Sequence, residues 1–177
     1  MRMVDPKQGG HDLFWRALWA FITLPGVVGV LIPAVIVPLD PWRGHVQLIG
    51  VLPLAVGAAI LFSCVRNFLL IGKGTLAPWD PPKHLVVVGP HRFTRNPMYI
   101  GLLLSIAGLS WTAASPLLAA YVVAMGLVFH WRVVFYEEPW CKKQFGKEWV
   151  AYSQKVPRWL LRRNIRKIRV EDFSRRM

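Results

Sequence analysis

Charged residues are scarce in this sequence. They make up 18% of the chain, against about 25% in a typical soluble domain. Three stretches contain no Asp, Glu, Lys or Arg at all: 17–39, 46–65 and 96–131. About 20 mostly apolar residues are enough to cross a bilayer, and the third stretch is long enough to cross twice. This absence of charge argues against a soluble core with buried helices and predicts an integral membrane protein.

Cysteine is also rare, and two familiar sequence signals are missing. The only cysteines, Cys64 and Cys141, form neither a disulfide framework nor a metal cluster, so we expect no metal. The first apolar run is too long for a signal peptide and no small-residue cleavage site follows it, so we expect it to remain as an anchor. The segment 72–75 lacks the spacing of a phosphate-binding loop.

The uncharged stretches predict an all-α membrane bundle that forms a single domain over 1–177. We expect four transmembrane helices, at about 13–39, 46–71, 98–113 and 116–136. Ser115 is a candidate N-cap, and Pro116 suits the first position of the last helix. Because the connection before Ser115 is so short, the third and fourth helices should form an antiparallel hairpin.

Lys and Arg are distributed unevenly between the predicted connections. They collect in 72–97 and in the tail after Tyr136, whereas the turn between the first two spans holds only Arg43. The positive-inside rule then places both termini and the 72–97 segment in the cytoplasm, with a basic C-terminal helix and a tail over 161–177. The net charge of +13 follows from this bias and does not predict nucleic-acid binding.

The segment 72–97 has the composition of an ordered loop. Five prolines and three glycines prevent a long helix, yet the segment also carries Trp79, His84, His91 and Phe93. A plain linker would rarely combine so many aromatic residues with the apolar run 85–88. We expect this run to pack on the membrane helices, which would fix the loop as a ligand site above the hairpin.

Two further groups of residues lie at predicted helix ends. Asn96 should stand at the N-terminus of the third helix, where free N–H groups favour an anion. Glu137 and Glu138 end the fourth helix, where two carboxylates are costly unless water, a cation or an arginine meets them. Pro139 should direct the chain out of that helix. Arg132 lies one turn earlier and could snorkel to the interface or turn inward to an anion.

These segments, in this order, resemble the isoprenylcysteine carboxyl methyltransferase family in its short prokaryotic form. The resemblance covers about 72–160, whereas the two spans in 1–71 resemble nothing specific. It rests on Leu85-Val86, Gly89-Pro90-His91-Arg92-Phe93-Thr94-Arg95-Asn96-Pro97-Met98-Tyr99-Ile100-Gly101, Glu137-Glu138, and Phe145-Gly146-Lys147-Glu148-Trp149-Val150-Ala151-Tyr152 followed by Val156-Pro157-Arg158-Trp159. Any one piece is a weak signal, but the ordered set is specific.

The resemblance implies an enzyme that transfers a methyl group from S-adenosylmethionine to a lipophilic acceptor entering from the membrane, here the cytoplasmic membrane of a prokaryote. By position it assigns catalysis to Glu137, Glu138 and Arg132. The family's substrate-carboxylate arginine aligns with Val133, next to Arg132. The implied cofactor-binding residues are Lys83, His84, Leu85, Val86, His91, Arg95, Asn96, Pro97, Met98 and Tyr99.

Several functions remain open at this point. The resemblance favours an isoprenylcysteine-like carboxylate as the acceptor, with a phospholipid amine as the alternative. A membrane reductase of the sterol-reductase type would bind NADPH instead, using Lys83, Arg92 and Arg95 for the extra phosphate. A non-catalytic membrane anchor with a basic tail would bind no cofactor, and it leaves the patterns at 96–99 and 137–138 unexplained.

Overall fold

A computed structural model describes residues 22–72 and 83–159 of the chain. These residues are helical with no strand, which confirms the all-α prediction for them. The order of the main elements is η1 (Ile22–Leu31), α2 (Ile32–Leu39), α3 (Val51–Asn67), α4 (Pro97–Ala113), α5 (Pro116–Arg132) and α6 (Glu138–Lys155), with the short helices η2 (Leu48–Gly50), η3 (Phe68–Gly72), η4 (Gly89–Arg92) and η5 (Val133–Glu137) between them. The predicted basic tail lies outside the described residues.

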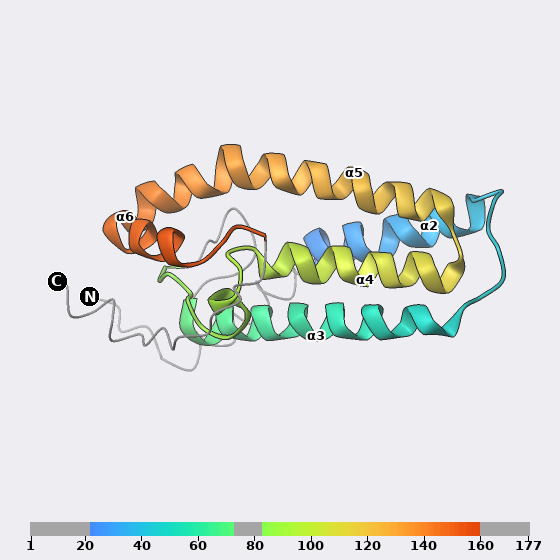
Figure 1. The fold of residues 1–177 in the computed structure, drawn as a ribbon, viewed down its shortest axis with the longest axis horizontal. Helices are drawn as coiled ribbons and strands as arrows, with labels where there is room; N and C mark the ends of the chain where they lie inside the picture. Colours follow the sequence, from blue (N-terminus) through green and yellow to red (C-terminus); the bar gives the residue numbers. More distant parts are fainter. Residues whose placement is uncertain (1–21, 73–82, 160–177) are drawn as a thin grey trace, which may run out of the picture.

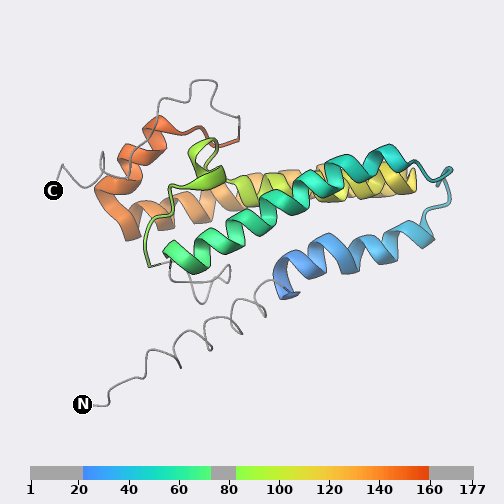
Figure 2. The same ribbon diagram turned by 90° about the horizontal axis from the view of Figure 1, so that it is seen from below.

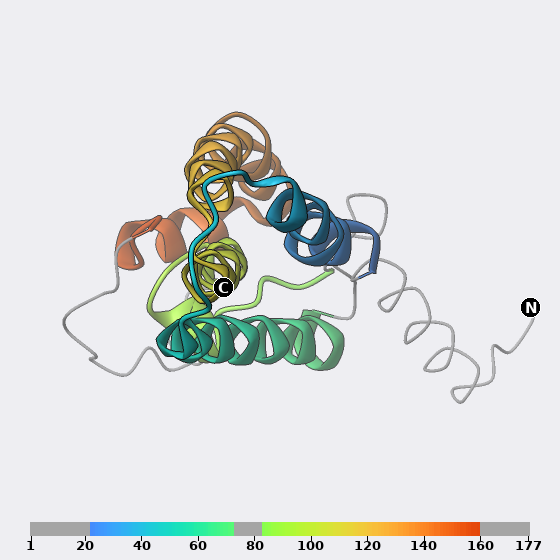
Figure 3. The ribbon, with the colours of Figure 1, turned by 90° about the vertical axis from the view of Figure 1, so that its right-hand side faces the viewer.

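Helix α4 is the central element of the bundle. Figure 3 looks along the bundle and shows α3, α5 and the η1–α2 segment arranged around α4. Leu102 and Ile106 of α4 form a buried core with Leu61 of α3 and with Leu118 and Phe129 of α5. The helices on the outside of the bundle leave many large apolar side chains exposed, among them Leu52, Val56, Phe62, Val123, Leu127 and Val128, as expected for surfaces that face lipid.

Helices α3 and α4 approach each other through glycine. A Cβ atom on Gly108 would lie 2.3 Å from the backbone nitrogen of Leu54, and one on Gly57 would lie 2.4 Å from Oγ of Ser105. Small residues that allow such close backbone contact are typical of helix packing in membranes. The contact fixes the position of α4, whose N-terminus carries part of the candidate site.

The connection between α4 and α5 is built as the sequence predicts. Ala114 adopts a left-handed conformation with φ of 46°, and the Ser115 hydroxyl accepts a hydrogen bond from the Leu118 N–H at 3.2 Å. Asp40 adds a longer-range contact, since its carboxylate accepts hydrogen bonds from the Ser115 hydroxyl and from the Leu117 N–H. The hydrogen bond from Ser115 is the largest of the contacts that lower the pKa of Asp40.

Among the described residues, two helical segments are long and apolar enough to cross a membrane, Leu48–Gly72 and Pro116–Lys155. Two further apolar segments, Pro25–Leu39 and Pro97–Ala113, are shorter. A helix of 40 residues would be ~60 Å long, about twice the hydrocarbon thickness. The second segment therefore extends past the apolar region, and only the α5 part of it matches a span.

The end of the fourth helix differs from the prediction. The chain does not leave the helix at Pro139 but continues through η5 into α6, in which Pro139 occupies the first turn. Pro is tolerated there because the first N–H groups of a helix have no partner within it. The sharp break comes at Gly146, whose φ of 50° and ψ of −119° are not helical. Beyond this residue α6 folds back toward the segment 85–92 before α4, as Figures 1 and 2 show.

Candidate active site

Glu137 joins the ends of α4 and α5. Its Oε1 atom accepts a hydrogen bond from the Tyr99 hydroxyl, in the first turn of α4, and another from Nε of Arg132 at 2.9 Å. The Tyr99 ring stacks on Phe129 of α5 with 4.5 Å between ring centroids. The carboxylate thus has a neutral donor on one helix and a cationic donor on the other.

The π-helical segment η5 explains why Arg132 reaches Glu137. In an α-helix, residues five apart point roughly 140° away from each other around the axis. A π-helix bonds each N–H to the carbonyl five residues back, so residues five apart lie one above the other. Val133, at the position that the resemblance assigns to an arginine, is instead fully buried.

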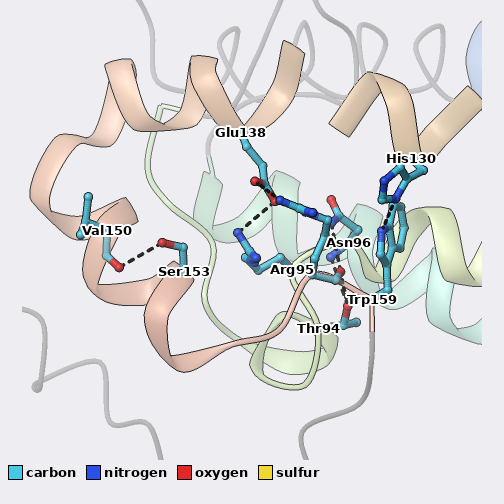
Figure 4. A network of polar contacts seen from close by, with 9 residues as sticks. Thr94, Arg95, Asn96, His130, Glu138, Val150, Ser153 and Trp159 are labelled. Carbon is cyan, nitrogen blue, oxygen red and sulfur yellow. Dashed lines mark hydrogen bonds and ion pairs between the residues drawn. The ribbon is translucent and has the colours of Figure 1, made fainter. Parts of the chain in front are cut away.

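Glu138 forms a second and separate charge cluster. Its carboxylate pairs with Arg95 at 2.9 Å and accepts two hydrogen bonds from Arg158, at 2.7 and 2.8 Å. Figure 4 shows Glu138 reaching from the start of α6 toward Arg95. Charge-assisted pairs of this kind are among the stronger hydrogen bonds in proteins, so the cluster ties α6 to the loop before α4.

The segment after α6 completes this side of the site. The Arg158 carbonyl accepts hydrogen bonds from Oγ1 of Thr94 at 2.9 Å and from Nδ2 of Asn96 at 3.1 Å. The Trp159 indole donates to Nδ1 of His130 at 2.9 Å, and the two rings face each other in Figure 4. The Arg95 N–H also donates to the Pro157 carbonyl at 2.9 Å, so the segment 157–159 ties the loop before α4 to α5.

The apolar run at 85–88 does not pack where it was expected. Val87 is buried in a cluster with Trp149, Tyr152 and Val156, and Leu85 packs at the edge of the same cluster. The prediction that this run packs on the membrane helices is therefore wrong for these two residues. The run at 85–88 covers α6. Because α6 bends at Gly146, the face that carries Trp149 and Tyr152 turns back toward this run.

A cavity of about 120 Å³ lies between these elements. Of the candidate residues, eight line it: His84, Leu85, Val86, His91, Arg95, Asn96, Glu137 and Glu138. The other five do not: Lys83, Pro97, Met98, Tyr99 and Arg132. Tyr99 and Arg132 nevertheless contact Glu137, whereas Met98 packs against the core of the bundle.

Six lining residues were not among the candidates. They are Phe68, Trp140, Cys141, Phe145, Trp149 and Tyr152. Four of them carry aromatic rings on α6, at successive spacings of five, four and three residues. Aromatic residues clustered after the Glu pair are the sequence signal for this wall of the cavity. The sequence alone does not show that α6 bends at Gly146, so the signal does not indicate that these rings line one cavity.

Two polar atoms in this wall have no partner among the described residues. They are Nδ1 of His91 and Nε of Arg95, both buried. Burial lowers the pKa of His91 from its usual value to about 4, so the imidazole is neutral near pH 7. A buried polar atom without a partner is costly, and here both belong to residues that line the cavity. The site thus places unpartnered polar atoms, aromatic surface and the Glu137 carboxylate around one cavity.

Two comparisons with known proteins match the chain to methyltransferases. Residues 46–148 match the model of the family "Phospholipid methyltransferase". Over 74 residues the chain is 35% identical to "Protein-S-isoprenylcysteine O-methyltransferase B" from Arabidopsis thaliana. That alignment covers 41% of this chain and 37% of the plant protein, so the chain spans little more than a third of this relative. No solved structure matches the chain.

Proposed function

This chain belongs to the phospholipid methyltransferase family, and on that premise we propose that it transfers a methyl group from S-adenosylmethionine to a lipophilic acceptor. Methyltransferases of this family take S-adenosylmethionine as the methyl donor. The observation that carries the proposal is the convergence of both Glu137 and Glu138 on one cavity with aromatic walls.

The residues that line the cavity fit this donor chemically. When bound, S-adenosylmethionine supplies an electrophilic methyl group on a sulfonium cation. Glu137 would provide negative charge close to that cation, and the aromatic rings of Trp140, Phe145 and Trp149 would provide the faces that attract cations and purine rings. The unpartnered atoms of His91 and Arg95 would meet the polar groups of the donor.

The chain itself supplies orientation and exclusion of water rather than acid–base chemistry. Glu137 is held by Tyr99 and Arg132, so its charge has a fixed position before any ligand arrives, and this preorganisation favours charge stabilisation. If the acceptor is a carboxylate, an in-line displacement needs alignment and a dry site more than a base. For an amine acceptor, Glu137 would take the proton that the amine loses.

The acceptor we favour is a carboxylate of an isoprenylcysteine-like lipid. The plant relative carries that activity in its name, and Arg132 places a cation at the end of α5 beside Glu137. The description of the matching family supports the second candidate, a phospholipid amine. The reductase hypothesis loses support, because the match is to a methyltransferase family and because Arg95, one of its three cations, pairs with Glu138.

We further propose a topology of four spans: the helix that ends at α2, then α3, α4 and α5. Both termini would lie in the cytoplasm of a prokaryotic cell, with α6 and the cavity at the cytoplasmic face. The bias of Lys and Arg toward that end supports this orientation. The loop that joins α2 to α3 would then lie on the opposite side.

One experiment separates the acceptors. Purified full-length protein is incubated with methyl-labelled S-adenosylmethionine and with either a farnesylcysteine analogue or extracted phospholipids. We expect label in the methyl ester of the cysteine analogue, which releases methanol on mild base treatment. Base-stable label in phosphatidylethanolamine would favour the amine, and no label in either lipid class would contradict the proposed function.

A further inference from the structure

A second cavity lies at the end of the bundle opposite the candidate active site. It has a volume of about 380 Å³ and is bounded by the end of α2, the 43–46 loop and the end of α4. Figure 1 places this loop and the α4–α5 turn together at the far end of the molecule from α6. Two of its lining residues, Arg43 and His45, carry basic side chains, and its apolar wall includes Val37, Val46 and Leu109.

The loop that carries the basic residues is fixed in place. The Gly44 N–H donates to the Ala114 carbonyl at 3.0 Å, and the Gln47 N–H donates to the Thr112 carbonyl at 2.9 Å. The Trp111 indole also donates to Oε1 of Gln47 at 2.9 Å. These bonds hold both ends of the loop against the C-terminus of α4, so the cavity is formed before any ligand enters it.

Arg43 forms no ion pair with Asp40, the acid closest to it in sequence, although its charge adds a small part to the lowered pKa of that carboxyl. Asp40 is buried, and its carboxylate is occupied by the Ser115 hydroxyl and by the N–H groups of Trp42 and Leu117. Among residues 22–72 and 83–159, no carboxylate lies within ion-pair distance of Arg43. A cation at this end also runs against the positive-inside bias.

Aromatic side chains mark the depth of this cavity in the membrane. Trp42 and Trp111 are 71% and 52% exposed, one in the loop and the other on the last turn of α4. Tryptophan is enriched where the hydrocarbon meets the headgroups. A ligand in the cavity would therefore have its polar part at headgroup level and its apolar part beside Val37 and Leu109.

We propose that this cavity binds an anionic phospholipid of the non-cytoplasmic leaflet. Arg43 and His45 would contact its phosphate, and the apolar wall would contact the upper part of an acyl chain. The inference depends on the proposed orientation in the membrane but not on methyl transfer. Such a lipid would brace the α2–α3 loop against the α4–α5 turn and so stabilise the bundle.

The test compares the thermal midpoint of full-length protein in neutral detergent after adding phosphatidylglycerol or phosphatidylcholine. For the unaltered protein we expect a larger upward shift with phosphatidylglycerol. The double variant Arg43→Gln/His45→Gln should need at least about fivefold more phosphatidylglycerol for the same shift, since one well-placed arginine contributes about a factor of five to lipid affinity. The matched control Lys142→Gln/Lys143→Gln, on α6, should behave as the unaltered protein.

Five outcomes are informative. Equal phosphatidylglycerol response in the double variant and the unaltered protein would overturn the proposal, as would an equal response of the unaltered protein to both lipids. A matching shift with inorganic phosphate alone would overturn the lipid assignment. Arg43→Lys, which keeps the charge, should retain the preference. Stabilisation by S-adenosylmethionine, measured on the same samples, should be unchanged in the double variant and reports separately on the cytoplasmic site.

Discussion

Removal of one hydroxyl group, in Tyr99→Phe, tests the arrangement around Glu137. The Tyr99 hydroxyl donates to a carboxylate, and a hydrogen bond to a charged group contributes about 1.5–3 kcal/mol. The ring stack on Phe129 remains in the variant, so packing changes little. If that interaction serves to position Glu137, turnover should fall by about tenfold to a hundredfold, because each 1.4 kcal/mol corresponds to a factor of ten.

Tyr121→Phe is the matched control. The Tyr121 hydroxyl, on α5, donates to the Val28 carbonyl at 3.0 Å, and loss of that neutral hydrogen bond should cost about 1 kcal/mol of stability with turnover within twofold of the unaltered protein. Initial rates of labelled methyl transfer and thermal midpoints are measured for both variants. Normal turnover in Tyr99→Phe, with unchanged KM for S-adenosylmethionine, would refute the role assigned to Glu137.

Three further results are expected. Gly108→Leu should lower the thermal midpoint by about 5 °C or more, because the new side chain would meet the α3 backbone. Gly126→Leu is the control and should not lower it, because the closest atom to a Cβ at that position is 3.9 Å away. Equal midpoints in the two variants would contradict the close packing of α3 and α4. The pKa of His91 is lowered to about 4, so the unfolded chain takes up a proton near pH 6.5 and the folded chain only near pH 4. The thermal midpoint should therefore fall as the pH drops from 6.5 to 4. His91→Gln should flatten this part of the profile of midpoint against pH, and an unchanged slope would count against a buried neutral imidazole. Glu138→Gln should lower both the thermal midpoint and turnover, because it weakens the pairs with two arginines. Glu148→Gln, the control on the same helix, should leave both quantities unchanged. An equal loss of turnover in the two variants would point to a general effect of charge on α6.

The parts of the fold that the sequence predicts depend on local signals. Uncharged length indicates the helices, and Ser115 with Pro116 marks the start of α5 because a capping hydroxyl and a residue without an N–H act within a single turn. The family match confirms the resemblance to a methyltransferase family. That resemblance is specific because it rests on ordered motifs rather than on composition. Four spans remain a prediction, since only two helical segments within 22–72 and 83–159 meet the length for crossing.

The site could be predicted only in part, since its shape depends on two irregular turns. The π-helical turn η5 pairs Arg132 with Glu137, and no residue pattern distinguishes such a turn from an ordinary one. The break at Gly146 folds α6 back, which brings Trp149 and Tyr152 to the cavity; glycine at that position permits the left-handed φ but does not require it. The sequence therefore predicts the end of the straight helix at Pro139, whereas the structure has it at Gly146.

Calorimetric titration of the purified full-length protein with S-adenosylmethionine tests the central claim most directly. We predict saturable binding to one site per chain in the unaltered protein and binding weakened by at least about tenfold in Glu137→Gln, since the carboxylate that faces the cavity loses its charge. No saturable binding to the unaltered protein, or equal affinity in the variant, would contradict the account.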